Sequence, residues 1–261
     1  MSATTVILTA ATCCLTIWSL AAEPEHKTDR HARFLALGES PPFRQEIRNG
    51  VRYELDVPAD SIPPREVVPQ CGKESAAAVA LHLERISTPV AVPEGEGTLD
   101  LRRAGEAPDA LPWLRINRPA AGDFLVLLWR NPAQKSWRDA VYLIVPDGPA
   151  GAPAGTVRIV NLFPQAIRVM WGDESQVLAA GKSIQRSVRP AAEIPFQILV
   201  PDRSGTMTRY YSGNVTQNRG ERGLVTVYRA DGTAPRRPVK VLALREPAPP
   251  APPPPADAKK A

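Results

Sequence analysis

The sequence predicts an all-β protein of two antiparallel β-sandwich-like domains in tandem, preceded by a signal peptide and followed by a Pro-rich disordered tail. Apolar runs that end in Asn49-Gly50, Asp147-Gly148 or Asp231-Gly232 recur along the chain, as is typical of strands joined by tight turns. No segment carries apolar residues at a helical period over three turns. Many of the 29 prolines stand between these runs or in the tail, where they oppose helix formation.

Residues 1–22 contain no Lys, Arg, Asp or Glu, and their apolar stretch ends at Ala21 and Ala22. A short apolar core with small residues before the first charge is typical of a secretory signal peptide. We therefore expect cleavage after Ala21 or Ala22 and a periplasmic or secreted protein with no membrane span in the mature chain. Two alternatives are an N-terminal membrane anchor over residues 6–22 and a lipoprotein modified at Cys13 or Cys14.

Cleavage would leave Cys71 as the single cysteine of the mature chain, so we expect no internal disulfide and no cysteine metal cluster. Of the three histidines, His82 has no second ligand beside it at a spacing typical of metal sites, and an alternative is that His26 and His31 collect a stray metal ion with Glu23 or Asp29. His26 and His31 lie in a polar leader that we expect to be solvated. The sequence thus predicts neither a metal nor another cofactor.

The first domain is expected over residues 23–146, and its clearest local signal is a hairpin over residues 43–55. Asn49-Gly50 supplies the two positive φ angles of a type I′ turn there. The period of two gives one shared face to Phe43, Gln45 and Ile47 on the first strand, and to Val51, Tyr53 and Leu55 on the return strand. Further strands are expected at residues 79–86, 98–102, 113–117 and 124–130, with a helical turn as an option for residues 74–80.

Residues 147–155 form the predicted linker, because Gly, Pro and Ala residues stand there between two β-like regions. Charge changes across the linker. Residues 23–155 hold 16 Lys and Arg against 19 Asp and Glu, net −3, whereas residues 156–246 hold 14 against 7, net +7. We expect the basic second domain, residues 156–246, either to dock on the acidic first one or to face a polyanion.

The second domain and the tail have equally simple signatures. The tail, residues 247–261, is rich in Pro and Ala, so we expect it to be extended and solvated, acting as a tether. Strands in the second domain are expected at residues 157–161, 167–171, 183–188, 196–200, 224–229 and 239–244.

The strand-loop-strand segment of residues 124–148 has a near-repeat in residues 196–232, which has a longer loop. Each segment is an apolar strand, a polar loop with aromatic and Arg residues, and a second strand closed by Asp-Gly. This pattern favours one small β design used twice. The strands at residues 156–162 and 167–173 also resemble the opening strands of secreted bacterial β-sandwich domains, a resemblance that supplies no catalytic residue.

The best candidate ligand site is the long loop of the second segment, residues 203–222. Tyr faces and Arg guanidinium groups stack on and hydrogen-bond to sugars, aromatic groups and carboxylates. An envelope protein or an anionic polymer or glycan is therefore the expected partner, and nucleic acid is not expected because the chain is exported. The candidate residues are Arg203, Arg209, Tyr210, Tyr211, Asn214, Arg219 and Arg222.

The sequence holds no motif of nucleophilic catalysis, no HExxH zinc motif and no phosphate-binding loop. It therefore favours a non-catalytic exported protein of the cell envelope that works by binding or assembly. One alternative is a secreted hydrolase with a site between the domains, which predicts a buried carboxylate pair in a cleft. The other is a structural subunit of an envelope complex, which predicts an exposed apolar patch or an unpaired strand edge.

Overall fold

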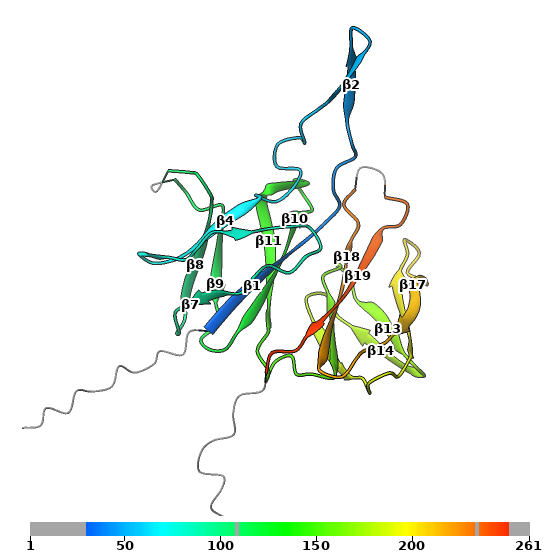
Figure 1. Cartoon of the computed structure of the whole chain (residues 1–261). Helices are drawn as coiled ribbons and strands as arrows, with labels where there is room; N and C mark the ends of the chain where they lie inside the picture. The colour runs from blue at the N-terminus through cyan, green and yellow to red at the C-terminus, as the bar shows by residue number, and fades with distance from the viewer. Residues whose placement is uncertain (1–29, 108–109, 233–234, 251–261) are drawn as a thin grey trace, which may run out of the picture.

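The computed structural model describes residues 30–107, 110–232 and 235–250, so the predicted signal peptide and residues 251–261 of the predicted tail lie outside it. Nineteen strands and no helix occur in this described part of the chain (Figure 1), which confirms the all-β prediction. Two strands form a separate hairpin, and the others form four sheets, called here I to IV.

Sheets I and II are formed by residues of the N-terminal half. Sheet I has the strand order β11-β10-β1-β7, and sheet II has the order β5-β4-β8-β9, with β6 paired to β4. The strands of sheet I are β1 (Arg30–Leu37), β7 (Val90–Val92), β10 (Phe124–Asn131) and β11 (Ser136–Pro146). Those of sheet II are β4 (Glu66–Cys71), β5 (Glu74–Ser75), β6 (Val79–Ala80), β8 (Gly97–Arg103) and β9 (Leu114–Arg118).

Sheets III and IV are formed by residues of the C-terminal half. Sheet III has the order β15-β12-β18-β19, and sheet IV has the order β14-β13-β16-β17. The strands of sheet III are β12 (Thr156–Asn161), β15 (Ser183–Ser187), β18 (Glu221–Arg229) and β19 (Val239–Pro247). Those of sheet IV are β13 (Ile167–Trp171), β14 (Glu174–Leu178), β16 (Ile194–Pro201) and β17 (Met207–Val215).

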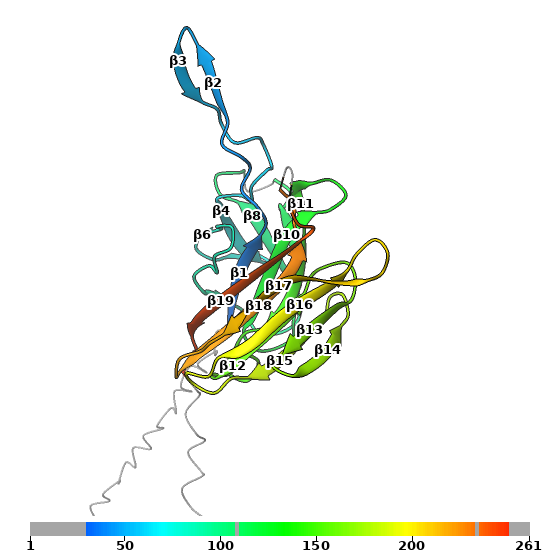
Figure 2. The same ribbon diagram turned by 90° about the vertical axis from the view of Figure 1, so that its right-hand side faces the viewer.

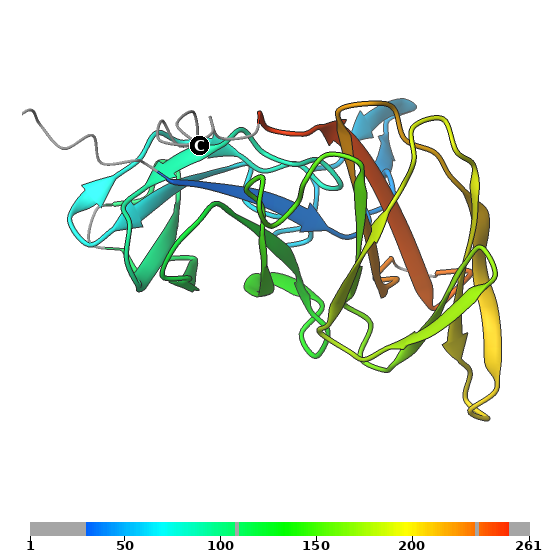
Figure 3. The ribbon, with the colours of Figure 1, turned by 90° about the horizontal axis from the view of Figure 1, so that it is seen from below.

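Three apolar clusters order the sheets as layers II, I, III and IV. The first cluster lies between sheets I and II and includes Phe34 and Phe124. The second lies between sheets III and IV and includes Ile159 and Phe196. The third lies between sheets I and III, so it joins the two halves of the chain (Figure 3). Its buried members are Leu35, Leu37, Leu125, Leu127, Val145, Val160, Leu162 and Tyr228.

Because sheets I and III are covered on both faces, their central strands are apolar on both faces. Phe34 points into the first cluster, while its neighbour Leu35 points into the third, and both are completely buried. The same alternation runs through β10, whose first five residues are all buried. Strands buried on both faces read as continuous apolar runs rather than as alternating ones, which explains the run Phe-Leu-Val-Leu-Leu of β10.

Sheets I and III are mixed, whereas sheets II and IV are antiparallel, so the antiparallel prediction is wrong at two pairs. β1 runs parallel to β10, and β12 runs parallel to β18. A parallel pair needs a crossover connection instead of a hairpin. In each half, the strands of the outer sheet, II or IV, lie within that connection.

The strand orders of the two halves match. Sheet I corresponds to sheet III when β11-β10-β1-β7 is laid on β19-β18-β12-β15, and sheets II and IV correspond in the same way. The near-repeat predicted between residues 124–148 and 196–232 is therefore misaligned. The β10–β11 hairpin corresponds to β18–β19, whereas β16 belongs to an outer sheet.

Residues 30–37 form the inner strand β1, so the expectation of a solvated leader is wrong for Arg30, although the His31 side chain is exposed as expected. Arg30 made this segment look polar, but its guanidinium is buried against three carbonyl oxygens, those of Pro93, Gly95 and Pro119, and lies over the Phe124 ring. Residues 74–80 hold the short strands β5 and β6 instead of a helical turn. By contrast, all six strands expected in residues 156–246 are present.

Leu127→Ala should destabilise the whole molecule, because Leu127 is completely buried in the cluster that joins the halves. We expect a loss of about 2–5 kcal/mol in the free energy of unfolding. Urea denaturation followed by fluorescence measures this, with the exposed Val177→Ala of β14 as the matched control. Separate transitions for the two halves of the wild type would contradict the common core.

Candidate binding surfaces

A hairpin over residues 43–55, called here the arm, stands away from the four sheets. It consists of β2 (Gln45–Arg48) and β3 (Val51–Glu54), and Figures 1 and 2 show it projecting beyond the rest of the molecule. Asn49 and Gly50 close its two-residue turn with φ angles of 51° and 78°, which confirms the predicted hairpin. Neither strand pairs with any of the four sheets.

The arm exposes apolar side chains that a sheet would ordinarily bury. The exposed fraction is 68% for Phe43, 63% for Ile47, 53% for Val51 and 49% for Tyr53. These are four of the seven large hydrophobic residues that are exposed in the described part of the chain. A two-stranded hairpin with no covering element is marginally stable in water. The arm is therefore the strongest candidate for a contact surface.

The strand register places the apolar residues of the arm on both of its faces. Ile47 lies opposite Arg52, and Glu46 lies opposite Tyr53. Residues opposite each other in an antiparallel pair share a face. Phe43, Gln45 and Ile47 thus face one way, and Val51, Tyr53 and Leu55 face the other. The charged residues nearly balance, since Arg44, Arg48 and Arg52 stand with Glu46 and Glu54, and Asp56 follows directly after the arm.

The predicted ligand loop, residues 203–222, contains a strand. Its residues 207–215 form β17, an edge of sheet IV. Arg203 is exposed before this strand and Arg219 after it. A strand of nine residues at about 3.3 Å per residue separates its two ends by roughly 26 Å, and the two arginines lie beyond opposite ends. They therefore do not converge on one ligand. Arg209 is exposed on the strand itself, and Asn214 lies 3.5 Å from the Glu193 carboxylate.

Tyr210 and Tyr211 turn toward the second apolar cluster because β17 contains a bulge. Ile198 pairs with Tyr211 and Leu199 with Arg209, so Tyr210 is the extra residue. The ring centres of Tyr211 and Phe196 are 5.6 Å apart. Both tyrosines are half-buried against the cluster. The sequence could not show this, because the bulge depends on the partner strand.

Arg222 is buried between the two halves, so it does not present its guanidinium to a surface ligand. It belongs to an ionic cluster with Arg33, Asp147 and Glu246. Arg33 lies 2.6 Å from an oxygen of each carboxylate. Arg222 lies 3.1 Å from Asp147 and 2.8 Å from Glu246. Each carboxylate is thus paired with an arginine from each half of the chain.

The ionic cluster stabilises the charged forms of Glu246 and Arg33. Burial alone would raise the pKa of Glu246, but hydrogen bonds and charge from Arg33 and then Arg222 lower it. Burial likewise opposes the charge of Arg33, but the hydrogen bonds that it donates to the Glu246 and Asp147 carboxylates raise its pKa. Glu246 therefore stays ionised at neutral pH and holds no proton to donate.

The predicted linker, residues 147–155, is held in place by the surrounding protein. Arg158 of β12 donates to the carbonyl oxygens of Pro146 and Gly151. Arg222 donates to the carbonyl oxygen of Asp147. The arginines thus bind the backbone where the chain crosses from one half to the other.

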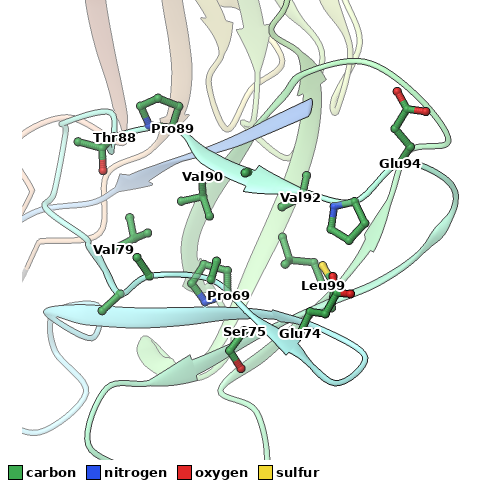
Figure 4. Close-up of a pocket in the computed structure, with 16 residues that line it drawn as sticks. Pro69, Glu74, Ser75, Val79, Thr88, Pro89, Val90, Val92, Glu94 and Leu99 are labelled. Carbon is green, nitrogen blue, oxygen red and sulfur yellow. The ribbon is translucent and has the colours of Figure 1, made fainter. Parts of the chain in front are cut away.

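Figure 4 shows a cavity of about 660 Å³ between β7 and the short strands β5 and β6. Its walls are mostly Ala, Val, Pro and Leu, with Glu74 and Glu94 among the few charged residues that line it. Such a lining suits an apolar side chain or a small apolar molecule. The close-up shows no nucleophile and base pointing at each other among its labelled residues.

Cys71 also lines this cavity and is half-buried at the end of β4. Burial raises the pKa of its thiol, Glu74 and Asp100 raise it further, and Arg118 and Arg30 partly oppose the shift. A raised thiol pKa lowers the thiolate fraction and the reactivity. In the described residues, no three or more His, Cys, Asp or Glu side chains are placed to hold a metal ion. The same residues include no helix long and apolar enough to cross a membrane.

The chain matches no protein-family model, and no curated protein matches it. Function is therefore inferred from the surfaces described above.

Glu246→Gln should destabilise the protein at neutral pH by about 3 kcal/mol, because it leaves the buried Arg222 and the partly buried Arg33 with one carboxylate. Since folding lowers the pKa of Glu246 below its ordinary 4.5, its contribution is full above that value and is lost as the pH falls through the folded pKa. Urea denaturation between pH 3 and 7 measures both effects. The exposed Glu174→Gln should change stability little, and an equal loss in both variants would contradict the assignment.

Cys71 should react slowly with a thiol-specific disulfide reagent in the native chain. In a chain that starts at residue 23, it is the single thiol, so absorbance reports it alone. We expect native labelling to be at least about tenfold slower than labelling in urea. Equal rates in both conditions would show that the thiol is open to solvent.

Proposed function

We propose that this protein is an exported, non-catalytic protein of the cell envelope, in which two tandem β-sandwich domains form one body that carries the arm to a protein partner. The observation that carries the proposal is the exposure of Phe43, Ile47, Val51 and Tyr53 on a hairpin that pairs with no other strand. An exposed apolar patch and unpaired strand edges are typical of surfaces that bind other proteins.

The arm is an addition to the fold, and its two strands pair with none of the four sheets. Between β1 and β4 the chain inserts residues 38–65, which hold the arm, whereas only residues 162–166 separate the corresponding β12 and β13. The matching strand order of the second half forms without such a hairpin. The arm's apolar residues therefore have a use other than folding, and contact with a partner is the use that their chemistry supports.

The ionic cluster supports a non-catalytic function over the hydrolase alternative. Asp147, which is buried, and Glu246, which is partly buried, are a carboxylate pair between the halves, as a hydrolase would have. Arg33 and Arg222, however, occupy both carboxylates, and the pKa of Glu246 is lowered. A general acid needs a raised pKa and a free path to substrate.

The exposed Arg203, Arg209 and Arg219 support a supplementary attraction to anionic envelope polymers. They spread along β17 and its two ends without forming a pocket. Scattered charge of this kind acts over a distance and without selectivity for one ligand. We assign the specific contact to the arm and a general electrostatic attraction to the basic half.

Site-specific photocrosslinking in cells that express the full chain tests this proposal. Benzoylphenylalanine at position 53 of the arm should give crosslinked adducts in the envelope fraction. The same residue at position 177, an exposed apolar position of β14, is the matched control and should give none. Adducts absent at 53, equal at both positions, or confined to the cytosol would overturn the proposal.

A further inference from the structure

We propose that the partner of the arm is a second copy of this chain, and that two arms pair through their β3 edges. The product would be a four-stranded antiparallel sheet in the order β2-β3-β3-β2. This inference rests on the proposed function, because it names the molecule that the arm contacts. It follows from the direction of the backbone groups of β3 and from the order of charges along it.

Backbone groups of Arg52 and Glu54 point outward from the arm. The backbone N–H of Leu55 donates to the carbonyl oxygen of Arg44 at 3.0 Å, so Leu55 is bonded toward β2. In an antiparallel pair the inward-bonded residues alternate, which makes Tyr53 and Val51 inward as well. The outer edge of β3 thus offers the N–H and C=O groups of Arg52 and Glu54 to another strand.

Only one two-fold register pairs opposite charges on this edge without placing like charges opposite each other. Outward residues must lie opposite outward residues, so Arg52 can face Arg52, Glu54 can face Glu54, or Arg52 can face Glu54. The first two place like charges directly opposite each other, which destabilises a strand pair. The third gives two Arg52–Glu54 pairs, with Tyr53 opposite Tyr53 and Val51 opposite Leu55.

This register also gathers the apolar residues of one face. Val51, Tyr53 and Leu55 share a face of β3, so two copies would place six such side chains side by side. In the single chain, Val51 and Tyr53 are exposed to solvent and Leu55 is half-buried. The pairing therefore covers apolar surface that the fold leaves open.

The β2 edge is less suited to the same pairing. Its outward residues within the strand are Gln45 and Ile47, which carry no charge to select a register. A charge-matched pairing of Arg44 with Glu46 would place Phe43, which lies before β2, opposite Ile47.

The position of the arm permits such a dimer. Because the arm projects beyond the sheets (Figure 2), an antiparallel partner arm places the two bodies at opposite ends of the new sheet. Two strands of this length bury less surface than a permanent dimer needs. The dimer should therefore form and dissociate with concentration.

Sedimentation velocity on the purified mature chain, residues 23–261, over a range of concentrations tests the inference. Arg52→Glu places glutamates opposite each other at both contacts, and Glu54→Arg places arginines opposite each other at both. Each single variant should therefore dimerise at least about tenfold more weakly than the wild type. In an equimolar mixture of the two variants, a glutamate of one chain again lies opposite an arginine of the other at both contacts, so a heterodimer should form. The double variant R52E/E54R should dimerise like the wild type, and equal far-UV spectra check that all variants fold.

Ile47→Thr is the matched control, since it changes an outward residue of β2 and leaves β3 intact. It should leave dimerisation unchanged. A wild type that stays monomeric at every concentration overturns the inference, as does a mixture that stays monomeric or a dimer lost only in Ile47→Thr. If the purified chain is monomeric while position 53 crosslinks to a different protein in cells, the proposed function stands and the self-pairing is wrong.

Discussion

Face-to-face packing of sheets I and III is the interaction on which the rest of the structure depends. The centre of this contact is apolar, and ion pairs lie on both sides of it. At one end stands the ionic cluster of Arg33, Asp147, Arg222 and Glu246. Elsewhere Arg130 binds Asp231 at 2.6 Å, and Glu84 accepts from Tyr228 at 2.9 Å and pairs with Lys240 at 2.6 Å. A large apolar contact with paired charges at its borders holds the two halves together as one body.

Local patterns predicted the strands well where each strand has its own turn signals. The six strands expected in the second half formed because alternating apolar residues and Gly-containing turns specify them within a few neighbours. β1 was not predicted because the groups that bind its arginines are distant in the sequence. Arg33 pairs with Glu246, 213 residues away, and Arg30 donates to a carbonyl 89 residues away. The pairing of β1 with β10 is equally non-local.

The candidate site was predicted least well, and for the same physical reason. Arg222 looked like a surface ligand because its partners, Asp147 and Glu246, lie far along the chain. Tyr210 and Tyr211 looked free because the bulge that turns them inward depends on β16. The arm, in contrast, was predicted as a hairpin from Asn49-Gly50 alone. Its exposure was not predictable, since a local pattern shows two apolar strand faces but does not show whether anything covers them.

The charges of the arm restrict which strand can pair with its edge. The body also has edge strands: β5 and β7 have only two and three residues, whereas β11, β17 and β19 are longer than the strands of the arm. The arm differs from them in the exposed apolar side chains on its faces. Arg52 and Glu54 lie two positions apart on the same edge. They repel a partner strand that places Arg opposite Arg52 and Glu opposite Glu54, and they attract one that places Glu opposite Arg52 and Arg opposite Glu54. An identical strand rotated by a two-fold axis presents this second arrangement. The charges that repel a misaligned strand therefore also select the aligned register. Arg52 and Glu54 supply these charges, and the same two residues direct their backbone N–H and C=O groups outward.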